Sequence, residues 1–324
     1  MNYLVTGACG FIGSRIAETL LDRGDRVLAI DNINDAYDTR LKDWRLAKML
    51  GRKGFEFHRA DICDRPHLES LLVRAGKIDA IINLAARAGV RQSLENPWTY
   101  FETNCTGTLN LLECARTQGI KKFVLASTSS LYGAHNTVPY SETDDTSRPL
   151  SQYAASKKAA ESLCYSYHHL YDLDISILRY FTVYGPAGRP DMSLFRFVQW
   201  ITEGRPVIVF GDGQQSRDFT FVDDIAAGTI AALKPAGYAI YNLGSDQPTV
   251  LMDVVRLVER LIGASARLEF RKAHPADVTA TWANINRARE VLNWNPAVTL
   301  ENGVGRLIEW YQENRLWARQ IDTT

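Results

Sequence analysis

The stretch TGACGFIG, residues 6–13, sets three glycines between two patterned segments of the chain. Residues 3–6 (YLVT) before it form a short apolar run, and residues 11–24 (FIGSRIAETLLDRG) after it repeat apolar residues at helical spacing. Such glycines suit a strand-to-helix turn whose backbone N–H groups meet the phosphates of a dinucleotide at the helix start; they are Gly7, Gly10 and Gly13. The spacing is GxxGxxG, so a tight turn without a ligand remains an alternative for the glycines alone.

An acidic residue follows the next apolar run. Asp31 comes directly after residues 26–30 (RVLAI), where a strand-end carboxylate accepts hydrogen bonds from the hydroxyls of an adenosine ribose. Because a carboxylate repels the 2′-phosphate of NADP, the sequence predicts NAD as the cofactor. The alternative for Asp31 is a turn residue at a strand end.

The first 180 residues alternate β-branched apolar runs with longer amphipathic stretches, which is typical of a parallel sheet covered by helices on both faces. The pattern predicts an α/β fold, a Rossmann-type doubly wound parallel sheet with a second, smaller α/β substrate-binding lobe. Beyond Tyr180 the loops are dense in Gly, Pro and Asp. We expect an NAD-binding domain over 1–181, a substrate lobe over 182–324, and a return of the chain to the first domain around 219–245.

Charge and cysteine content exclude several classes of protein. The 324 residues carry 37 Lys+Arg and 37 Asp+Glu, and this balance argues against a nucleic-acid-coating or membrane-surface protein. The five cysteines are scattered without a CxxC pair, so neither a disulfide framework nor a zinc site is predicted. No apolar run approaches the ~18 residues of a membrane helix. We therefore expect a cytoplasmic protein without a metal, a nucleic-acid partner or a membrane partner.

A tyrosine and a lysine lie one helical turn apart in YAASK, residues 153–157. For Tyr153 to act as a base near neutral pH, its pKa must fall by ~3 units, which is about 4 kcal/mol. The ammonium of Lys157 at ~5–6 Å supplies roughly 3 kcal/mol at an effective dielectric of ~20, and a bound nicotinamide cation would supply the rest. The phenolate would then take a proton from a sugar hydroxyl, which Thr128 would orient.

With these residues in place, the chain resembles the extended short-chain dehydrogenase/reductase family, and within it the nucleotide-sugar 4-epimerases. The resemblance spans nearly the whole chain and includes NLAA (83–86), RDFTFVDD (217–224) and HPADV (274–278). It implies a UDP-sugar substrate, NAD held throughout turnover, oxidation at C4 of the hexose, rotation of the 4-keto sugar and return of the hydride to its other face. It also implies a homodimer formed by the helices near 94–118 and 152–171.

The resemblance assigns residues to the cofactor. Besides the three glycines, those implied to contact NAD are Phe11, Ile12, Asp31, Asn32, Asp61, Ile62, Leu84, Ala85, Ala86, Asn104, Tyr153, Lys157 and Tyr180. For the UDP end of the substrate, family position implies Arg217 at the diphosphate and Asp277 at the uridine ribose. His274 stands where galactose-type epimerases carry a second phosphate-binding arginine, which puts that contact in doubt.

Three stretches look most like UDP-glucuronate 4-epimerases: DNINDAYD (31–38), AGVRQSLENP (88–97, with Arg91) and YFTVYGPAGRPDMSLF (180–195). In relatives acting on neutral sugars an asparagine often occupies the position of Thr182. Thr182, Ser129 and Ser130 form a neutral set of donors for a C5 carboxylate, with Arg189 nearby. The alternative is that these are ordinary loop hydroxyls and a surface arginine.

The segment STSSLYG, residues 127–133, contains no acidic residue. That absence bears on which reaction the protein catalyses. Oxidation at C4 of glucuronate gives a β-keto acid, which loses CO2 when the breaking bond aligns with the carbonyl π system. Neutral hydrogen-bond donors that hold the carboxylate near the carbonyl plane oppose that loss. Dehydrating and decarboxylating relatives typically carry a glutamate at the position of Ser130. Ser127 and Tyr132 are expected to be ordinary loop residues.

Other functions stay open on the sequence. The main alternative is a UDP-glucose or UDP-N-acetylhexosamine 4-epimerase, followed by a UDP-glucuronate decarboxylase. A redox-sensing protein without activity is disfavoured, because such proteins commonly lose the Tyr–Lys pair that this chain keeps. Asp223 and Asp224 precede an apolar helical run, and we expect them to cap that helix rather than take part in catalysis.

Overall fold

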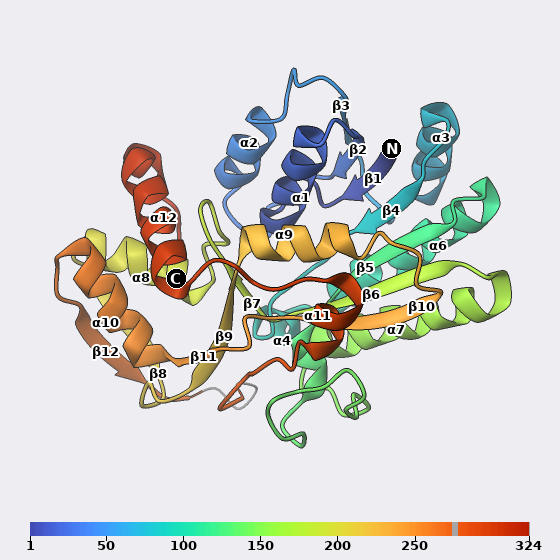
Figure 1. Cartoon of the computed structure of the whole chain (residues 1–324). Helices are drawn as coiled ribbons and strands as arrows, with labels where there is room; N and C mark the ends of the chain where they lie inside the picture. Colours follow the sequence, from blue (N-terminus) through green and yellow to red (C-terminus); the bar gives the residue numbers. More distant parts are fainter. Residues whose placement is uncertain (274–277, 324) are drawn as a thin grey trace.

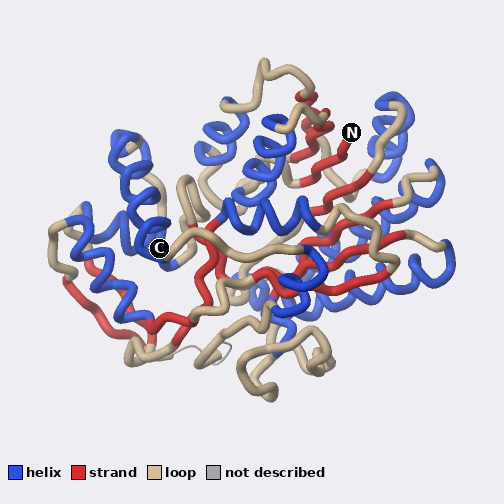
Figure 2. The backbone as a smooth tube through the Cα atoms, viewed as in Figure 1, coloured by secondary structure: helices blue, strands red, loops and turns tan. Residues whose placement is uncertain are grey.

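A computed structural model describes residues 1–273 and 278–323. In the described residues, seven parallel strands form one sheet, in the order β10-β6-β5-β4-β1-β2-β3 (Figures 1 and 2). The strands are β1 (Asn2–Thr6), β2 (Arg26–Asp31), β3 (Phe55–Arg59), β4 (Ala80–Asn83), β5 (Lys122–Thr128), β6 (Asp174–Tyr180) and β10 (Tyr238–Leu243). The strand order is that of a Rossmann sheet extended by one strand, so the predicted fold class is confirmed.

Helices cover both faces of this sheet. On one face lie α1 (Phe11–Asp22), α2 (Arg40–Ala47) and α9 (Val222–Ala231); on the other lie α3 (Arg65–Ala75), α6 (Gly107–Gln118) and α7 (Gln152–Tyr171). Successive side chains of β1 point to opposite faces of the sheet. Tyr3 and Val5 pack in the core under α1, and Leu4 packs in the core on the face covered by α3, α6 and α7.

In its described residues, the second lobe contains two small sheets and three longer helices. One sheet has the order β11 (Pro248–Val250), β9 (Ser216–Phe221), β7 (Thr182–Tyr184), and the other pairs β12 (Arg267–Arg271) with β8 (Pro206–Phe210). The helices are α8 (Ser193–Thr202), α10 (Leu251–Ile262) and α12 (Leu300–Glu313), gathered at the left of Figure 1, and α13 (Arg315–Ala318) follows α12. One cluster of buried apolar side chains runs from Val5 and Ile16 into this lobe, where it includes Val198 and Tyr311.

The chain passes between the lobes more than once. Strand β6 ends at Tyr180 and β7 begins at Thr182, so a single residue, Phe181, joins the two sheets. After β9, helix α9 packs against α1 and β10 pairs with β6, and α11 (Asn286–Leu292) packs against β10 and α9. The segment 182–324 is therefore not one continuous lobe, since α9 and β10 complete the first one.

The two acids at the start of α9 do not cap it. Asp223 pairs with Arg15 of α1 (Nε–Oδ1, 2.6 Å) and with Arg306 of α12 (Nη2–Oδ2, 2.9 Å). Asp224 accepts hydrogen bonds from the backbone N–H groups of residues 297 and 298. The capping prediction was wrong because both carboxylates face neighbouring elements instead of the free N–H groups of their own helix.

The segment leading into α6 changes its helical pitch. Short helices α4 (Gln92–Glu95) and α5 (Pro97–Phe101) are followed by a π-helical turn, η1 (Glu102–Thr106), before α6 begins. A 3₁₀ turn, η2 (Ser129–Tyr132), follows β5. Among the described residues, no helix has the length and apolar character needed to cross a lipid bilayer.

Candidate active site

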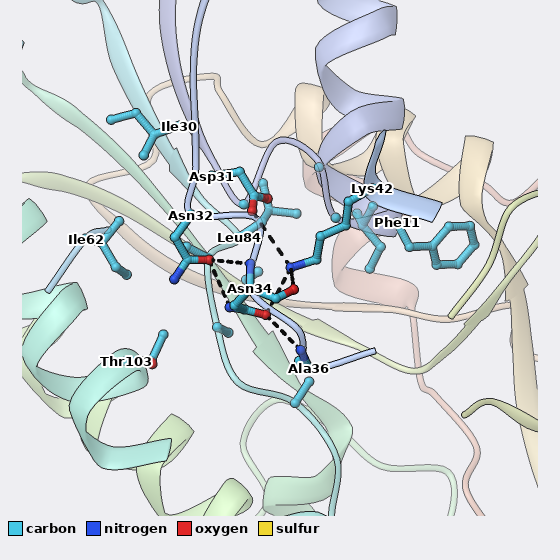
Figure 3. Close-up of a pocket in the computed structure, with 18 of the residues that line it drawn as sticks. Phe11, Ile30, Asp31, Asn32, Asn34, Ala36, Lys42, Ile62, Leu84 and Thr103 are labelled. Carbon is cyan, nitrogen blue, oxygen red and sulfur yellow. Dashed lines mark hydrogen bonds and ion pairs between the residues drawn. The ribbon is translucent and has the colours of Figure 1, made fainter. Parts of the chain in front are cut away.

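A cleft opens along the carboxyl ends of the central strands, where ligands of open parallel sheets bind. Its empty space, open solvent included, is about 1110 Å³. Figure 3 shows side chains from β2, the loop after it, α2 and η1 around this cleft. All the predicted cofactor-binding residues except Asn104 line it: Gly7, Gly10, Phe11, Ile12, Gly13, Asp31, Asn32, Asp61, Ile62, Leu84, Ala85, Ala86, Tyr153, Lys157 and Tyr180.

The glycine turn has no room for side chains. A Cβ on Gly7, which has φ +65°, would lie 2.8 Å from the backbone nitrogen of Ala85, and one on Gly13 would lie 2.1 Å from the carbonyl oxygen of Gly7. A Cβ on Gly10 would lie 2.9 Å from the same oxygen. The glycines thus let the start of α1 press against its own turn and against the loop after β4. This brings the N–H groups at the start of a 12-residue helix to the cleft, which fits a dinucleotide diphosphate.

Asp31 is fixed at the end of β2. Its carboxylate accepts hydrogen bonds from the backbone N–H of Cys9 (3.0 Å) and of Ile33 (2.8 Å). The Lys42 ammonium from α2 lies 3.9 Å from Asp31 Oδ1 and donates to the carbonyl and side-chain oxygens of Asn34 (Figure 3). Asp31 therefore faces the cleft with its charge partly balanced, an arrangement that fits a ribose diol.

A second carboxylate continues this wall. Asp61 accepts a hydrogen bond from the Asn32 amide (2.7 Å) and one from the backbone N–H of Cys63 (2.9 Å). Although burial opposes the shift, these bonds hold the pKa of Asp61 below its usual value. Together with the Ile62 side chain beside it, Asp61 forms a polar and apolar surface suited to an adenine ring.

Asn104 differs from the prediction, because it stands behind the cleft wall. On the π-helical turn, its buried side chain donates to the Arg87 carbonyl (3.0 Å) and to Ser156 Oγ (2.9 Å), and accepts from the Arg87 N–H (2.9 Å). The amide thereby ties the loop after β4 to α7. The residue of this turn that lines the cleft is its neighbour Thr103.

Tyr153 and Thr128 meet at the inner end of the cleft. Thr128 closes β5, and Tyr153 lies in the first turn of α7, which Ser151 caps by accepting from the Ala154 N–H (3.2 Å). Burial raises the pKa of Tyr153, while a hydrogen bond with Thr128 and the charge of Arg189 oppose that rise. In the protein alone, the charge of Arg189 lowers the pKa of the phenol, and the share assigned to Lys157 stays a prediction.

Lys157 is nearly inaccessible, with 3% of its surface exposed. Burial lowers its pKa to about 8, against the opposing charge of Glu161 one turn further along α7. A lysine with this pKa gains and loses its proton within the range where enzymes work. The base and the cation of the predicted pair thus share one face of α7 at the cleft.

The predicted carboxylate donors lie at the junction of the lobes. Ser129 and Ser130 begin the 3₁₀ turn after β5, where Thr128 Oγ1 accepts from the Ser130 N–H and donates to Ser130 Oγ, each at 3.1 Å. Thr182 begins β7 opposite Phe219. All three hydroxyl-bearing residues are partly exposed and outside the cofactor lining.

Arg189 lines the cleft, and its guanidinium is already paired with the carboxylate of Asp191. Its guanidinium forms a two-pronged pair with Asp191 (Nε–Oδ1, 3.0 Å; Nη2–Oδ2, 2.6 Å) and donates to the Ala88 carbonyl (3.2 Å). This corrects the alternative of a surface arginine, since the side chain faces Tyr153. A substrate carboxylate would share Arg189 with Asp191.

Arg91, predicted to bind the substrate, and Arg217, predicted at its UDP end, both lie outside the cofactor lining. Arg91 lies with its guanidinium 4.0 Å from the ring centre of Phe210, and Arg217 on β9 donates to the Ser216 carbonyl (2.8 Å). Asp277 and His274 lie outside the described residues. Within the part of the chain that is described, no His, Cys, Asp and Glu side chains gather as a metal site.

The sequence itself matches a known family. Residues 3–244 match the model of the NAD dependent epimerase/dehydratase family. The chain belongs to this family. That match spans the glycine turn, the Tyr–Lys pair, helix α9 and strand β10. Strand β10 completes the central sheet.

Individual members of the family are similar over almost the full chain. The UDP-glucuronate 4-epimerase of Thermodesulfobacterium geofontis is 54% identical over 96% of both chains. A crystal structure of UDP-glucuronic acid 4-epimerase from Bacillus cereus, in complex with UDP-glucuronic acid and NAD, is 36% identical and covers 97% of this chain and 100% of that one, with a TM-score of 0.92. The UDP-glucose 4-epimerase of Thermotoga maritima, with UDP-glucose, covers 97% and 100% at 29% identity and a TM-score of 0.90.

In this family member, sequence reasoning missed several residues in or near the cleft, among them Lys42, Ser127 and Tyr132. Lys42 was overlooked because a lysine within a helical pattern usually faces solvent. Ser127 and Tyr132 are buried, contrary to the expectation of loop residues: Ser127 lines the cleft and donates to Glu161, and Tyr132 donates to Asn242. Their one available signal was position, since Ser127 directly precedes Thr128 at the end of a buried run.

Proposed function

We propose that the chain is an NAD-dependent UDP-glucuronate 4-epimerase, an isomerase that interconverts UDP-glucuronate and UDP-galacturonate through a transient 4-keto sugar. One observation carries the choice of reaction: the turn that follows Thr128 presents Ser129 and Ser130, and no acid, beside a Tyr–Lys pair. The high identity to a UDP-glucuronate 4-epimerase supports the substrate. The glycine turn, Asp31 and the other residues of the cleft would hold NAD, which would supply hydride acceptance and return at C4.

The chain's own residues handle the proton. Tyr153 removes the proton of the C4 hydroxyl as the alcohol is oxidised and returns it when the ketone is reduced. Thr128, bonded to the phenol, orients that hydroxyl. Arg189 places positive charge beside the phenol and favours its ionised form, which burial opposes. Lys157, one helical turn further along α7, adds a second positive charge on the same helix face.

A separate group of residues holds the substrate carboxylate. Hydroxyls of Ser129, Ser130 and Thr182 donate to it, and Arg189 attracts it electrostatically. Held near the plane of the C4 carbonyl, the carboxylate leaves the C5–carboxylate bond poorly aligned with the π system, which suppresses loss of CO2. At the other end of the substrate, Arg91 and Arg217 bind the diphosphate, because a guanidinium donates in a planar fork.

Parallel incubations of the purified protein with NAD and either UDP-glucuronate or UDP-glucose test this function. Formation of UDP-galacturonate from the first supports it. The neutral-sugar alternative draws on the structural similarity to a UDP-glucose 4-epimerase, and activity confined to UDP-glucose would establish it instead. A UDP-pentose product would make the protein a decarboxylase.

Assembly and location are further parts of the proposal. We propose a homodimer through the helices near 94–118 and 152–171, acting in the cytoplasm. Exposed apolar side chains on these helices support the interface, with Trp98 82% exposed and Leu170 63% exposed. Sedimentation equilibrium of the wild type and of Trp98→Glu tests it: a dimer that the substitution dissociates is expected, and a monomeric wild type contradicts it.

A further inference from the structure

A buried carboxylate stands directly behind the Tyr–Lys pair. Glu161 on α7 is 3% exposed and accepts hydrogen bonds from Ser127 Oγ (2.6 Å) and from Arg179 Nε (3.1 Å) and Nη2 (2.9 Å). Arg179 on β6 is itself 2% exposed. Taking both charges out of water is costly, and buried pairs of this kind are often replaceable by apolar residues without loss of stability. Stability alone therefore gives a weak reason for this pair.

The position of Glu161 connects it to the site. It lies four residues after Lys157 on the same face of α7. Ser127, which donates to it, lines the cleft and precedes Thr128 on β5. The carboxylate thus joins the helix that carries Tyr153 and Lys157 to the strand that carries Thr128.

The far side of the carboxylate is also held. Arg179 donates to the Tyr132 hydroxyl (3.1 Å) and to the Glu142 carbonyl (3.2 Å), and Tyr132 donates to Asn242 of β10 (2.5 Å). Glu161 is therefore fixed from β5, β6 and, through Tyr132, from β10. A carboxylate held on both oxygens keeps a fixed place, one helical turn from Lys157.

We propose that Glu161 is a positioning residue of the epimerase reaction: held by Ser127 and Arg179, it keeps Lys157 charged and in place beside Tyr153. The inference rests on the proposed function for its catalytic consequence. Its physical core, that Glu161 sets the protonation of Lys157, does not depend on the substrate.

The other titratable groups near Lys157 cannot take this role. Cys164 on α7 and Cys105 on η1 face it, and burial raises the pKa of both thiols, so both are neutral at working pH. Facing Glu161 are Cys164, Arg179 and, on β10, Tyr238, whose phenol pKa burial also raises. Of the groups that act on Lys157 in the described chain, Glu161 alone is a carboxylic acid.

The sign of the effect follows. Loss of the Glu161 charge lowers the pKa of Lys157 further below about 8. Lys157 then becomes neutral at a lower pH and stops favouring the ionised form of Tyr153. The alkaline limb of the kcat–pH profile moves down, by up to about two pH units for a charge ~6 Å away at an effective dielectric of ~20.

The test uses paired substitutions so that no charge is left alone in the core. The variant Glu161→Gln with Arg179→Gln removes both charges and keeps hydrogen-bonding side chains of similar size. Glu161→Asp retains the charge. The pH dependence of kcat and of KM is measured on the protein loaded with NAD, and the protonation of Lys157 is measured independently by competitive acetylation of the cofactor-free protein, read by mass spectrometry.

We expect the double variant to shift both the alkaline limb and the Lys157 labelling curve to lower pH, with little change in KM, and Glu161→Asp to stay near the wild type. The matched control is Asp174→Asn, which breaks the Lys122–Asp174 pair (2.6 Å) at the other end of the same two strands. This control is expected to lose stability and keep the wild-type pH profile. Unchanged profiles in the double variant, or an equal shift in the control, overturn the proposal.

The labelling curve separates two failures. A wild type that turns over no UDP-sugar contradicts the proposed function, and the labelling of Lys157 still decides whether Glu161 sets its protonation. A labelling curve that does not move in the double variant contradicts this inference even if the wild type is an active epimerase.

Discussion

Ser130 occupies the position at which the outcome of the reaction is decided. Its N–H and Oγ are both bonded to Thr128, so the side chain is presented from a fixed turn. We expect Ser130→Glu to bring an acid to the C5 carboxylate, which either raises the fraction of UDP-pentose product or abolishes UDP-glucuronate binding by charge repulsion. Chromatography of the reaction products measures the fraction of UDP-pentose, and a binding measurement with UDP-glucuronate detects the loss of affinity. Ser130→Ala, which removes a donor and adds no acid, is the control, and an unchanged product ratio in Ser130→Glu counts against the carboxylate assignment.

Arg189 is the cation that acts on the Tyr153 phenol. Because its charge lowers the pKa of Tyr153, Arg189→Met should raise that pKa and move the acidic limb of the kcat–pH profile up by roughly half a unit to one unit. Asp191→Asn leaves the charge of Arg189 unbalanced, so it should move the limb the other way. Steady-state kinetics over pH distinguishes the two directions, and identical limbs in both variants would refute the role of Arg189.

Burial of the Lys157 charge lowers the stability of the folded protein, while the same charge is needed for epimerisation. Its pKa in the folded protein is about 8, below the ordinary value of 10.5, so the unfolded chain binds more protons and stability rises with pH between these values. The cost of burying the charge is fully present below pH ~8. Lys157→Met should therefore abolish epimerisation and raise the free energy of unfolding at neutral pH, by on the order of 3 kcal/mol.

That stabilisation should fall as the pH rises from about 8 toward 10.5 and vanish above 10.5, where the wild-type lysine is neutral in both states. Urea denaturation of both proteins at neutral and at alkaline pH measures the difference. A variant that is less stable than the wild type at neutral pH would show that the attraction to Glu161 outweighs the burial cost.

At the scale of elements, the glycine turn is the most constrained. A Cβ at position 13 would overlap the Gly7 carbonyl at 2.1 Å, whereas one at Gly305 on α12 meets no atom within 4 Å. Gly13→Ala should displace the start of α1, weaken NAD binding at least tenfold and lower the free energy of unfolding. Gly305→Ala should raise the free energy of unfolding by up to about 1 kcal/mol and leave NAD binding alone. Calorimetric titration with NAD and thermal unfolding test the pair.

Elements with a local pattern were predictable from the sequence. The first six strands, the glycine turn, Asp31 and the YAASK helix each follow from short-range periodicity or a motif, and the cleft lies where those motifs meet. The π-helical turn has no such pattern, and it is the reason that Asn104 faces the loop after β4 instead of the cleft. The Arg189–Asp191 and Lys42–Asp31 pairs escaped prediction as well, because side-chain pairing depends on loop geometry or tertiary packing that spacing alone does not reveal.

At the scale of the whole molecule, both lobes share one hydrophobic core. The cluster that contains Val5 and Ile16 continues to Val198 and Tyr311, and Asp223 joins α1 to α12 through two arginines. We expect the lobes to unfold together. Far-UV circular dichroism, which follows all helices, and tryptophan fluorescence, whose seven indoles include Trp200, Trp310 and Trp317 of the second lobe, should give coincident denaturation midpoints. Two separated midpoints would show that the lobes are independent.

The single-residue connection at Phe181 bears on how the reaction keeps its intermediate. Wide hinge opening needs a few residues that absorb large backbone rotations, and here one buried residue joins β6 to β7 while the lobes share a core. Substrate exchange therefore falls to the loops at the mouth of the cleft. With no wide opening between the lobes, we expect a 4-keto sugar to be reduced before it escapes, so that almost no ketone is released into solution.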